Sequence, residues 1–154
     1  MSTLVFREAR EDDLPRLVAM LADDDLGRGR ENSGPDLSPA YRKAFAEISS
    51  SSANRILVAE SDGAVVGTLQ LTVIPGLSRQ GAKRGLIEAV RVASDARGGG
   101  IGEKLVRHAI GVAKDAGCRL VQLTSDKRRA RAHEFYRRLG FEPSHEGFKL
   151  ELQP

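Results

Sequence analysis

The spacing of apolar positions changes several times along the chain, and each change predicts the start of a new element. Apolar residues that recur three and four positions apart predict four helices, at about residues 14–21, 39–48, 101–116 and 130–139. Short continuous or alternating apolar runs predict six strands, at about residues 4–6, 56–59, 65–74, 86–92, 120–124 and 148–152. The elements therefore follow one another in the order β, α, α, β, β, β, α, β, α, β.

Turn and cap residues fall between these elements. Asp62-Gly63 separates two strands and predicts a tight hairpin, while Ser38-Pro39 is typical of a helix start. Neither a linker nor a repeat divides the sequence, so we expect a single domain over residues 1–154, of the mixed α/β (α+β) class. The strand–turn–helix–strand unit at 86–124 predicts a crossover whose two strands run parallel.

A glycine-rich turn joins the predicted strand at 86–92 to the helix that follows it. The turn and the helix start consist of Arg97, Gly98, Gly99, Gly100, Ile101 and Gly102. Free backbone N–H groups and the helix dipole make such a start an anion site, and glycine lets a phosphate approach closely. The turn is not a dinucleotide fingerprint, because Glu103 occupies the last glycine position, and it lacks the Gly-Lys-Ser/Thr of a phosphate-binding loop.

Composition excludes several classes of protein. Apolar residues make up 40% of the sequence, and no apolar run approaches the ~20 residues that a membrane helix needs. The N-terminus lacks a signal-peptide pattern and Cys118 is the only cysteine, so we expect a cytoplasmic protein without membrane contact. The net charge of +3 and an aromatic content of 5% argue against a nucleic-acid partner. No His, Cys or carboxylate cluster in the sequence has metal-ligand spacing.

Two motifs resemble those of the GNAT N-acetyltransferases. One is the Arg-x-x-Gly-x-Gly of the glycine turn, and the other is Ala-x-x-Phe-Tyr-x-x-x-Gly-Phe at residues 132–141. The order of the elements also matches that family, so the resemblance covers nearly the whole chain. It implies a mixed central β-sheet with a V-shaped splay between two parallel strands, flanked by four helices. It also implies acetyl-coenzyme A as co-substrate and no metal.

The resemblance assigns the parts of acetyl-coenzyme A to particular residues. In the family the pantetheine arm lies in the splay, which here implicates the backbone of Val90, Arg91 and Val92. The pyrophosphate would bind the turn at 97–102. Many members have an asparagine three residues before the alanine of the late motif, where this sequence has Arg129. The usual asparagine contact to the arm is therefore not expected, and Arg129 or Arg131 is expected to reach a phosphate of coenzyme A instead.

Catalytic roles follow from the same resemblance. Tyr136 matches the tyrosine that protonates the leaving thiolate, and the backbone N–H near Val90 is the expected oxyanion donor. Glu88 is the candidate base that takes the proton of the amine, directly or through water. It should face the same side as Val90 unless a bulge intervenes. His133 and His145 are the other candidates for the base.

The acceptor amine is the least determined part of the prediction. In this fold the acceptor pocket is built from loops that correspond to 23–37, which is acidic, and 75–84, which is basic. The segment Ala132-His133-Glu134-Phe135-Tyr136 resembles the aminoalkylphosphonate N-acetyltransferases. The strand with Ile87-Glu88 and the later Gly117-Cys118 resemble the glucosamine-6-phosphate N-acetyltransferases. Both resemblances favour a small amine that carries a phosphonate or phosphate. A protein acetyltransferase and a non-catalytic acyl-coenzyme A-binding module are the alternatives, and the family resemblance also allows a homodimer.

Overall fold

The computed structural model describes residues 3–24, 26–34 and 36–153. Its five-stranded sheet has the spatial order β1-β2-β3-β4-β5. The strands are β1 (Leu4–Glu8), β2 (Asn54–Ser61), β3 (Ala64–Ile74), β4 (Lys83–Val92) and β5 (Cys118–Leu123). The helices are α1 (Leu14–Ala22), α2 (Pro39–Ser49), α3 (Ser78–Gly81), α4 (Ile101–Asp115) and α5 (Ala130–Arg138). The predicted mixed α/β class and the other four helices are confirmed. The segment α3 lies in a region that was expected to be a loop, and the φ angles of 55° at Arg79 and 60° at Gln80 make it a left-handed turn rather than a regular α-helix.

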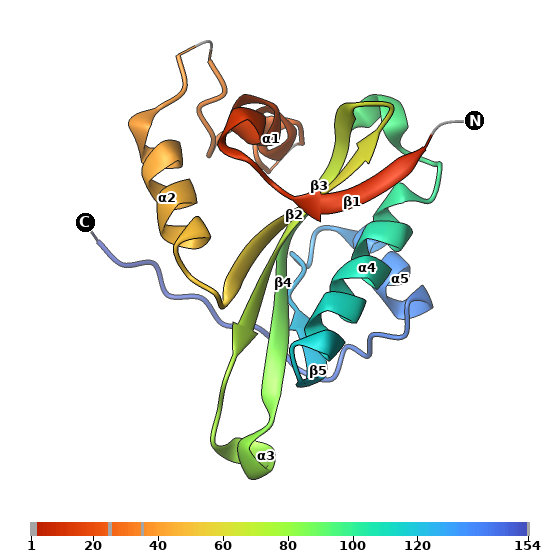
Figure 1. Cartoon of the computed structure of the whole chain (residues 1–154). Coiled ribbons are helices and arrows are strands. Elements are labelled where there is room, and N and C mark those ends of the chain that lie inside the picture. The colour runs from red at the N-terminus through yellow and green to blue at the C-terminus, as the bar shows by residue number, and fades with distance from the viewer. Residues whose placement is uncertain (1–2, 25, 35, 154) are drawn as a thin grey trace.

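Helices cover both faces of the sheet. Figure 1 shows α1 and α2 on one side and α4 on the other. The amphipathic α4 buries Leu105, Val106 and Ala109 in a core that includes Leu69 and Ile87 of the sheet. A second core lies on the opposite face, where α1 packs on β2 and β3. In the part of the chain that the structure describes, no helix is both long and apolar enough to cross a membrane.

Local sequence explains the hairpin and the helix starts. Asp62 and Gly63 have φ angles of 51° and 84°, as the two central residues of a type I′ turn require, and they connect β2 to β3. The side chain of Ser38 accepts a hydrogen bond from the Ala40 N–H at 3.3 Å and caps α2. These contacts confirm the predicted hairpin and the predicted start of α2.

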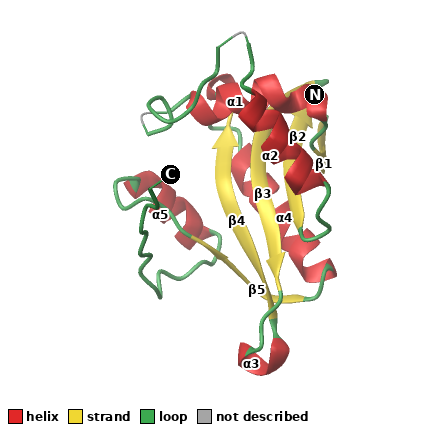
Figure 2. Cartoon of the chain, turned by 90° about the vertical axis from the view of Figure 1, so that its left-hand side faces the viewer, coloured by secondary structure: helices red, strands yellow, loops and turns green. Residues whose placement is uncertain are grey.

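The parallel strands β4 and β5 separate part of the way along β4. Their pairing runs from Lys83 to Ile87 of β4, whereas β4 continues to Val92. A β-bulge follows the point of separation: Ala89 has a φ of 54°, and the register with β3 shifts there. Figure 2 shows β5 diverging from β4, with α5 beyond the opening. This is the V-shaped splay that the family resemblance implies.

The predicted sixth strand, at residues 148–152, is wrong. The structure has no regular secondary structure there, and every residue from 142 to 153 is exposed. The alternation of Phe148, Leu150 and Leu152 is present, but a strand also needs a neighbouring strand to pair its backbone groups. No neighbouring strand pairs with this segment among the described residues.

Candidate active site

The glycine turn ends in a helix start that no side chain caps. Gly98 and Gly100 have φ angles of 87° and 79°, in the left-handed region that favours glycine. Gly100 is the N-cap residue of α4, and no side-chain hydrogen bond caps that helix. The Lys104 N–H donates to the Gly100 carbonyl at 3.1 Å, so the N–H groups of the preceding turn have no partner within the helix. Together with the helix dipole, these groups can bind an anion.

The start of α4 lies close to both β4 and α5. A methyl group on Gly102 would lie 3.4 Å from Val92 Cγ2 and 3.5 Å from Phe135 Cζ. Ile101 is half-buried and packs against the core, whereas Gly99 is exposed. The helix start, the end of β4 and α5 therefore meet at Gly102, where a methyl group would make ordinary contacts with both neighbours.

The Arg97 side chain turns back toward β4. Its Nε atom donates to the Val92 carbonyl at 3.1 Å, and Nη2 donates to the Asp23 carbonyl at 3.3 Å. The same Nη2 lies 3.8 Å from the Asp23 carboxylate, and about half of each of these side chains is exposed. Arg97 therefore ties the glycine turn to the ends of β4 and α1. The phosphate contact that the resemblance assigns to Arg97 stays a prediction.

Backbone groups of Val92 point into the splay. The Ala93 N–H donates to the Val66 carbonyl of β3 at 2.8 Å, and successive residues of a strand direct their backbone groups to opposite sides. Val92 therefore turns its backbone groups away from β3, toward the opening, where a ligand could accept from its N–H. Val90 lies within the bulge, so this alternation does not reach it; its carbonyl accepts a hydrogen bond from Arg91 Nη1 at 3.0 Å.

A carboxylate from the loop after α1 connects β4 to α5. Arg91 Nε lies 3.0 Å from Asp24 Oδ2, without the alignment of a hydrogen bond, and Arg129 Nη2 donates to the same oxygen at 3.2 Å. All three side chains are less than one third exposed. Burial alone would raise the pKa of Asp24, but the Gly27 N–H and the two guanidiniums outweigh it and lower that pKa. One negative charge faces two positive charges, so this cluster is net positive.

The sequence did not indicate the pairing of Asp24 with the two arginines of this cluster. The sequence places Asp24 in an acidic loop that could hold a cationic amine, whereas the structure engages it with two arginines. Its partner Arg129 is 105 positions away in the chain and forms the N-cap of α5. A charge pattern in the sequence carries no signal for a pairing at that separation.

Tyr136 lies in the aromatic part of α5. Its ring packs edge-on against Phe135 and Phe141, with centroids 5.1 and 5.8 Å away. Burial raises the pKa of the Tyr136 phenol, although the charges of Arg91 and Arg129 partly oppose this effect. The phenol is therefore protonated at neutral pH, which suits a proton donor. The two arginines that contact Asp24 are close enough to influence Tyr136, so the structure brings these predicted residues together.

Glu88 stands apart from this group. Its side chain is exposed, on the strand just before the bulge at Ala89. The bulge intervenes between Glu88 and Val90, so the two-residue alternation does not place them on the same side. Within the described ranges Glu88 forms no ion pair. No group of three His, Cys, Asp or Glu side chains that could hold a metal occurs in those ranges.

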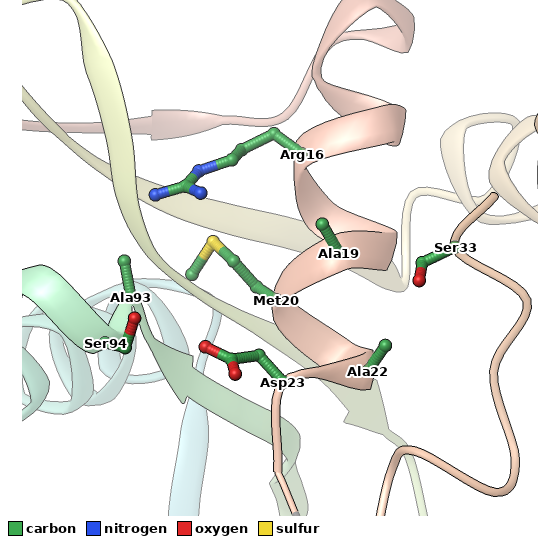
Figure 3. A pocket seen from close by; sticks show the side chains of 8 residues that line it. All are labelled: Arg16, Ala19, Met20, Ala22, Asp23, Ser33, Ala93 and Ser94. Carbon is green, nitrogen blue, oxygen red and sulfur yellow. The ribbon is translucent and has the colours of Figure 1, made fainter. Parts of the chain in front are cut away.

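A pocket of about 350 Å³ adjoins the glycine turn between α1 and the end of β4. Figure 3 shows Met20 of α1, and Asp23 just after α1, projecting toward Ala93 and Ser94, which connect β4 to the turn. Arg16 also lines this pocket, and its Nε donates to the Val65 carbonyl at 3.1 Å. None of the sequence-predicted site residues is among those that line the pocket. Its position beside the turn makes it a neighbour of the proposed pyrophosphate site.

Known proteins match this chain over most of its length. A structure from Bacillus halodurans C-125, described as a transcriptional regulator, is 49% identical, with 97% of this chain and 100% of that chain covered and a TM-score of 0.95. A putative acetyltransferase from Agrobacterium tumefaciens str. C58 is 31% identical, with coverages of 96% and 99% and a TM-score of 0.83. The glucosamine 6-phosphate N-acetyltransferase of Trypanosoma brucei brucei is 30% identical over 98 residues.

These matches differ in extent. The similarity to the trypanosomal protein covers 64% of this chain and 65% of that protein, just under two thirds of its length. The family model described as the acetyltransferase (GNAT) family matches residues 14–141, which include the glycine turn, the splay and α5. Because this match spans well over half of the sequence, the chain belongs to the GNAT family of acetyltransferases.

Proposed function

We propose that this protein transfers an acetyl group from acetyl-coenzyme A to a primary amine of a small molecule, by direct attack in a ternary complex. The observation that carries the proposal is the open edge of β4 beside the uncapped, glycine-rich start of α4. Backbone N–H groups at a helix start suit a pyrophosphate, and an open strand edge suits the two amides of the pantetheine arm. Val90, Arg91 and Val92 would hold the arm, and the turn at 97–102 would hold the pyrophosphate.

The chemistry needs a neutral amine, an oxyanion donor and a proton for the leaving thiolate. The Val90 N–H, beside the bulge where β4 and β5 separate, is the proposed donor to the oxyanion. Tyr136 is the proposed acid, because burial keeps its phenol protonated until the sulfur needs a proton. Glu88 is exposed, so it would take the amine proton through water rather than by direct contact.

The net positive cluster of Asp24, Arg91 and Arg129 suggests an acceptor that carries an anionic group. Guanidiniums bind phosphate and phosphonate oxygens well because their N–H groups match that geometry. The trypanosomal relative is named for an amine that carries a phosphate. We therefore favour a small amine with a phosphate or phosphonate group. Arg129 would contact this group or a phosphate of the co-substrate.

Two measurements test the proposal in sequence. Acetyl-coenzyme A at saturating concentration should raise the melting temperature, because it binds the folded state alone. Thiol release should then be measured with a panel of amines, comparing each phosphorylated or phosphonylated amine with its neutral analogue. No thermal shift would contradict the whole proposal. A thermal shift without thiol release from any amine would instead support a non-catalytic acyl-coenzyme A-binding module.

A regulatory role is the second candidate, because the relative that is 49% identical is described as a transcriptional regulator. A nucleic-acid surface would have to use the basic run at 127–131. Two arginines of this run already pair with carboxylates: Arg128 lies 2.7 Å from Asp126, and Arg129 lies 3.2 Å from Asp24. These pairs weigh against nucleic-acid binding by the run. Retention of the protein on a DNA column that falls steeply as the salt concentration rises would support nucleic-acid binding after all.

A further inference from the structure

Two guanidiniums from separate elements converge on one carboxylate oxygen beside the splay. Arg91 of β4 and Arg129 at the start of α5 lie 3.0 and 3.2 Å from Asp24 Oδ2. The other oxygen of Asp24 accepts a hydrogen bond from the Gly27 N–H, so the carboxylate is also held by its own loop. Phosphate and phosphonate oxygens suit the same pair of guanidiniums. Asp24 therefore occupies a subsite that an anionic ligand can use.

The contacts that Asp24 makes leave donors of both arginines unused. Arg91 Nε is buried and has no hydrogen-bond partner among the described residues, because it is not aligned with the carboxylate. A buried donor without a partner is costly, so a ligand oxygen that aligns with it stabilises the complex. Arg129 hydrogen-bonds to Asp24 through Nη2. It is also the N-cap of α5, which has no side-chain cap, so the helix dipole adds to the positive field.

The subsite lies on the same face of the sheet as Glu88. Arg91 is opposite Thr68 of β3, and directly opposed residues share a face. Glu88 is opposite Gln70, which is two positions from Thr68 and so faces the same side. The bulge thus brings Arg91 and Glu88 to one side of β4, about 7 Å apart along the strand. An amine at Glu88 and an acid group at Arg91 are then the two ends of one small acceptor.

We propose that Asp24 is an internal competitor for the acid group of the acceptor. In the free protein its carboxylate occupies the guanidiniums of Arg91 and Arg129, and the acid group of the acceptor takes them over. This inference rests on the proposed function and adds to it a residue that determines specificity.

The competition favours acids that carry two charges. A carboxylate ligand replaces one single negative charge by another, so its electrostatic gain over Asp24 is small. A phosphate or phosphonate carries nearly two negative charges at neutral pH and gains more from the same pair of guanidiniums. Asp24 therefore sets a threshold that phosphorus acids cross more readily than carboxylic acids.

Binding of simple anions tests this inference without acetyl transfer. Calorimetry would measure the affinities of inorganic phosphate and acetate for the wild type, Asp24→Asn and Arg129→Gln. The wild type should bind phosphate at least about ten-fold tighter than acetate. Asp24→Asn should bind each anion at least about ten-fold tighter than the wild type does, because the competing charge is gone. Arg129→Gln should bind phosphate at least about ten-fold more weakly, which distinguishes this subsite from the glycine turn.

Asp126→Asn is the matched control. It removes the same charge from the loop before α5, but the Asp126 carboxylate lies 2.7 Å from Arg128 and is not part of the subsite. Its removal should change the affinity for phosphate by less than about two-fold, because exposed charges are screened.

Several results would overturn the inference. An unchanged or weaker affinity of Asp24→Asn for phosphate would show that Asp24 holds the arginines in place rather than competing with the ligand. Equal affinities of the wild type for phosphate and acetate would remove the threshold, without reference to any variant. Full phosphate binding by Arg129→Gln would place the anion elsewhere. The expected anion affinities without acetylation of any amine would support the subsite and contradict the proposed function alone.

Discussion

The ion-pair cluster at Asp24 gives the sharpest quantitative prediction for folding. Asp24→Asn removes one negative charge and keeps the shape of the side chain, including an oxygen that can accept from the Gly27 N–H. At an effective dielectric constant of about 20, opposite charges 3.0 Å apart, as Arg91 and Asp24 are, attract by roughly 5 kcal/mol. Desolvation offsets much of this attraction.

The net change in the free energy of unfolding caused by Asp24→Asn should lie between the values known for fully buried and for exposed ion pairs. Breaking a fully buried pair costs about 3–5 kcal/mol, because the remaining charge is left without a partner, whereas exposed pairs contribute about 0–1 kcal/mol. Asp24, Arg91 and Arg129 are 17%, 14% and 31% exposed. We therefore expect Asp24→Asn to lower the free energy of unfolding by about 2 kcal/mol. In a domain of this size that is a fall in melting temperature of roughly 4–8 °C.

The neighbouring carboxylate supplies the control. Asp23 lies 3.8 Å from Arg97, and these side chains are 48% and 52% exposed. Asp23→Asn should therefore change the free energy of unfolding by less than about 1 kcal/mol. Both variants would be compared with the wild type by thermal and urea unfolding. Equal effects of Asp23→Asn and Asp24→Asn would contradict this prediction, because the two carboxylates differ in burial and should differ in their contribution to stability.

The contribution of Asp24 to folding stability should depend on pH in a definite direction. The pKa of Asp24 is lower in the folded protein than in the unfolded chain. The stabilisation that ionised Asp24 provides is thus fully present at pH values above the ordinary carboxyl pKa of about 4. It is lost as the pH falls through the lower pKa that Asp24 has in the folded protein. The gap in stability between wild type and Asp24→Asn should be constant near neutral pH and should shrink below about pH 4. A gap that persists at lower pH would show that charge is not its cause.

The remaining predictions concern catalysis and the glycine turn. Tyr136→Phe should lower kcat at least about ten-fold and leave the affinity for acetyl-coenzyme A unchanged by calorimetry, because the phenol acts only on the leaving thiolate; an unchanged kcat would remove Tyr136 as the acid. Glu88→Gln should lower kcat about 10²-fold if the carboxylate takes the amine proton, and a kcat near that of the wild type would assign the proton to solvent. Gly100→Ala should lower the free energy of unfolding by about 1–2 kcal/mol, since its φ is 79°. Gly111→Ala, in open space within α4, should raise the free energy of unfolding by up to about 1 kcal/mol. Changes of the same sign in the two glycine variants would contradict the different backbone roles given to Gly100 and Gly111.

Local patterns account for most of what the sequence predicts correctly. The apolar spacing at 101–116 and the left-handed glycines before it determine α4 and its start without help from distant residues. The Asp62-Gly63 turn likewise specifies the β2–β3 hairpin from two residues. The family motifs add the splay, which periodicity alone does not predict.

Features that depend on distant partners were not predictable. The bulge at Ala89 has no signal in the surrounding Glu-Ala-Val, and it is what separates Glu88 from the side that Val90 faces. The pairing of Asp24 with Arg129 depends on how two separate loops meet. The segment at 148–152 was predicted as a strand from its alternation alone, but no strand among the described residues pairs with it.

The left-handed backbone at Ala89 also limits how this protein can tolerate sequence change. With a φ of 54°, position 89 disfavours β-branched residues strongly and accepts Gly, Asn or Asp far more readily. Its neighbours in β4 should show the reverse preference, because extended backbone favours Val and Ile. A deep mutational scan would therefore show one position in the middle of a strand with the substitution spectrum of a turn. Such a spectrum could locate the opening of the splay in homologous chains before any of their structures is known.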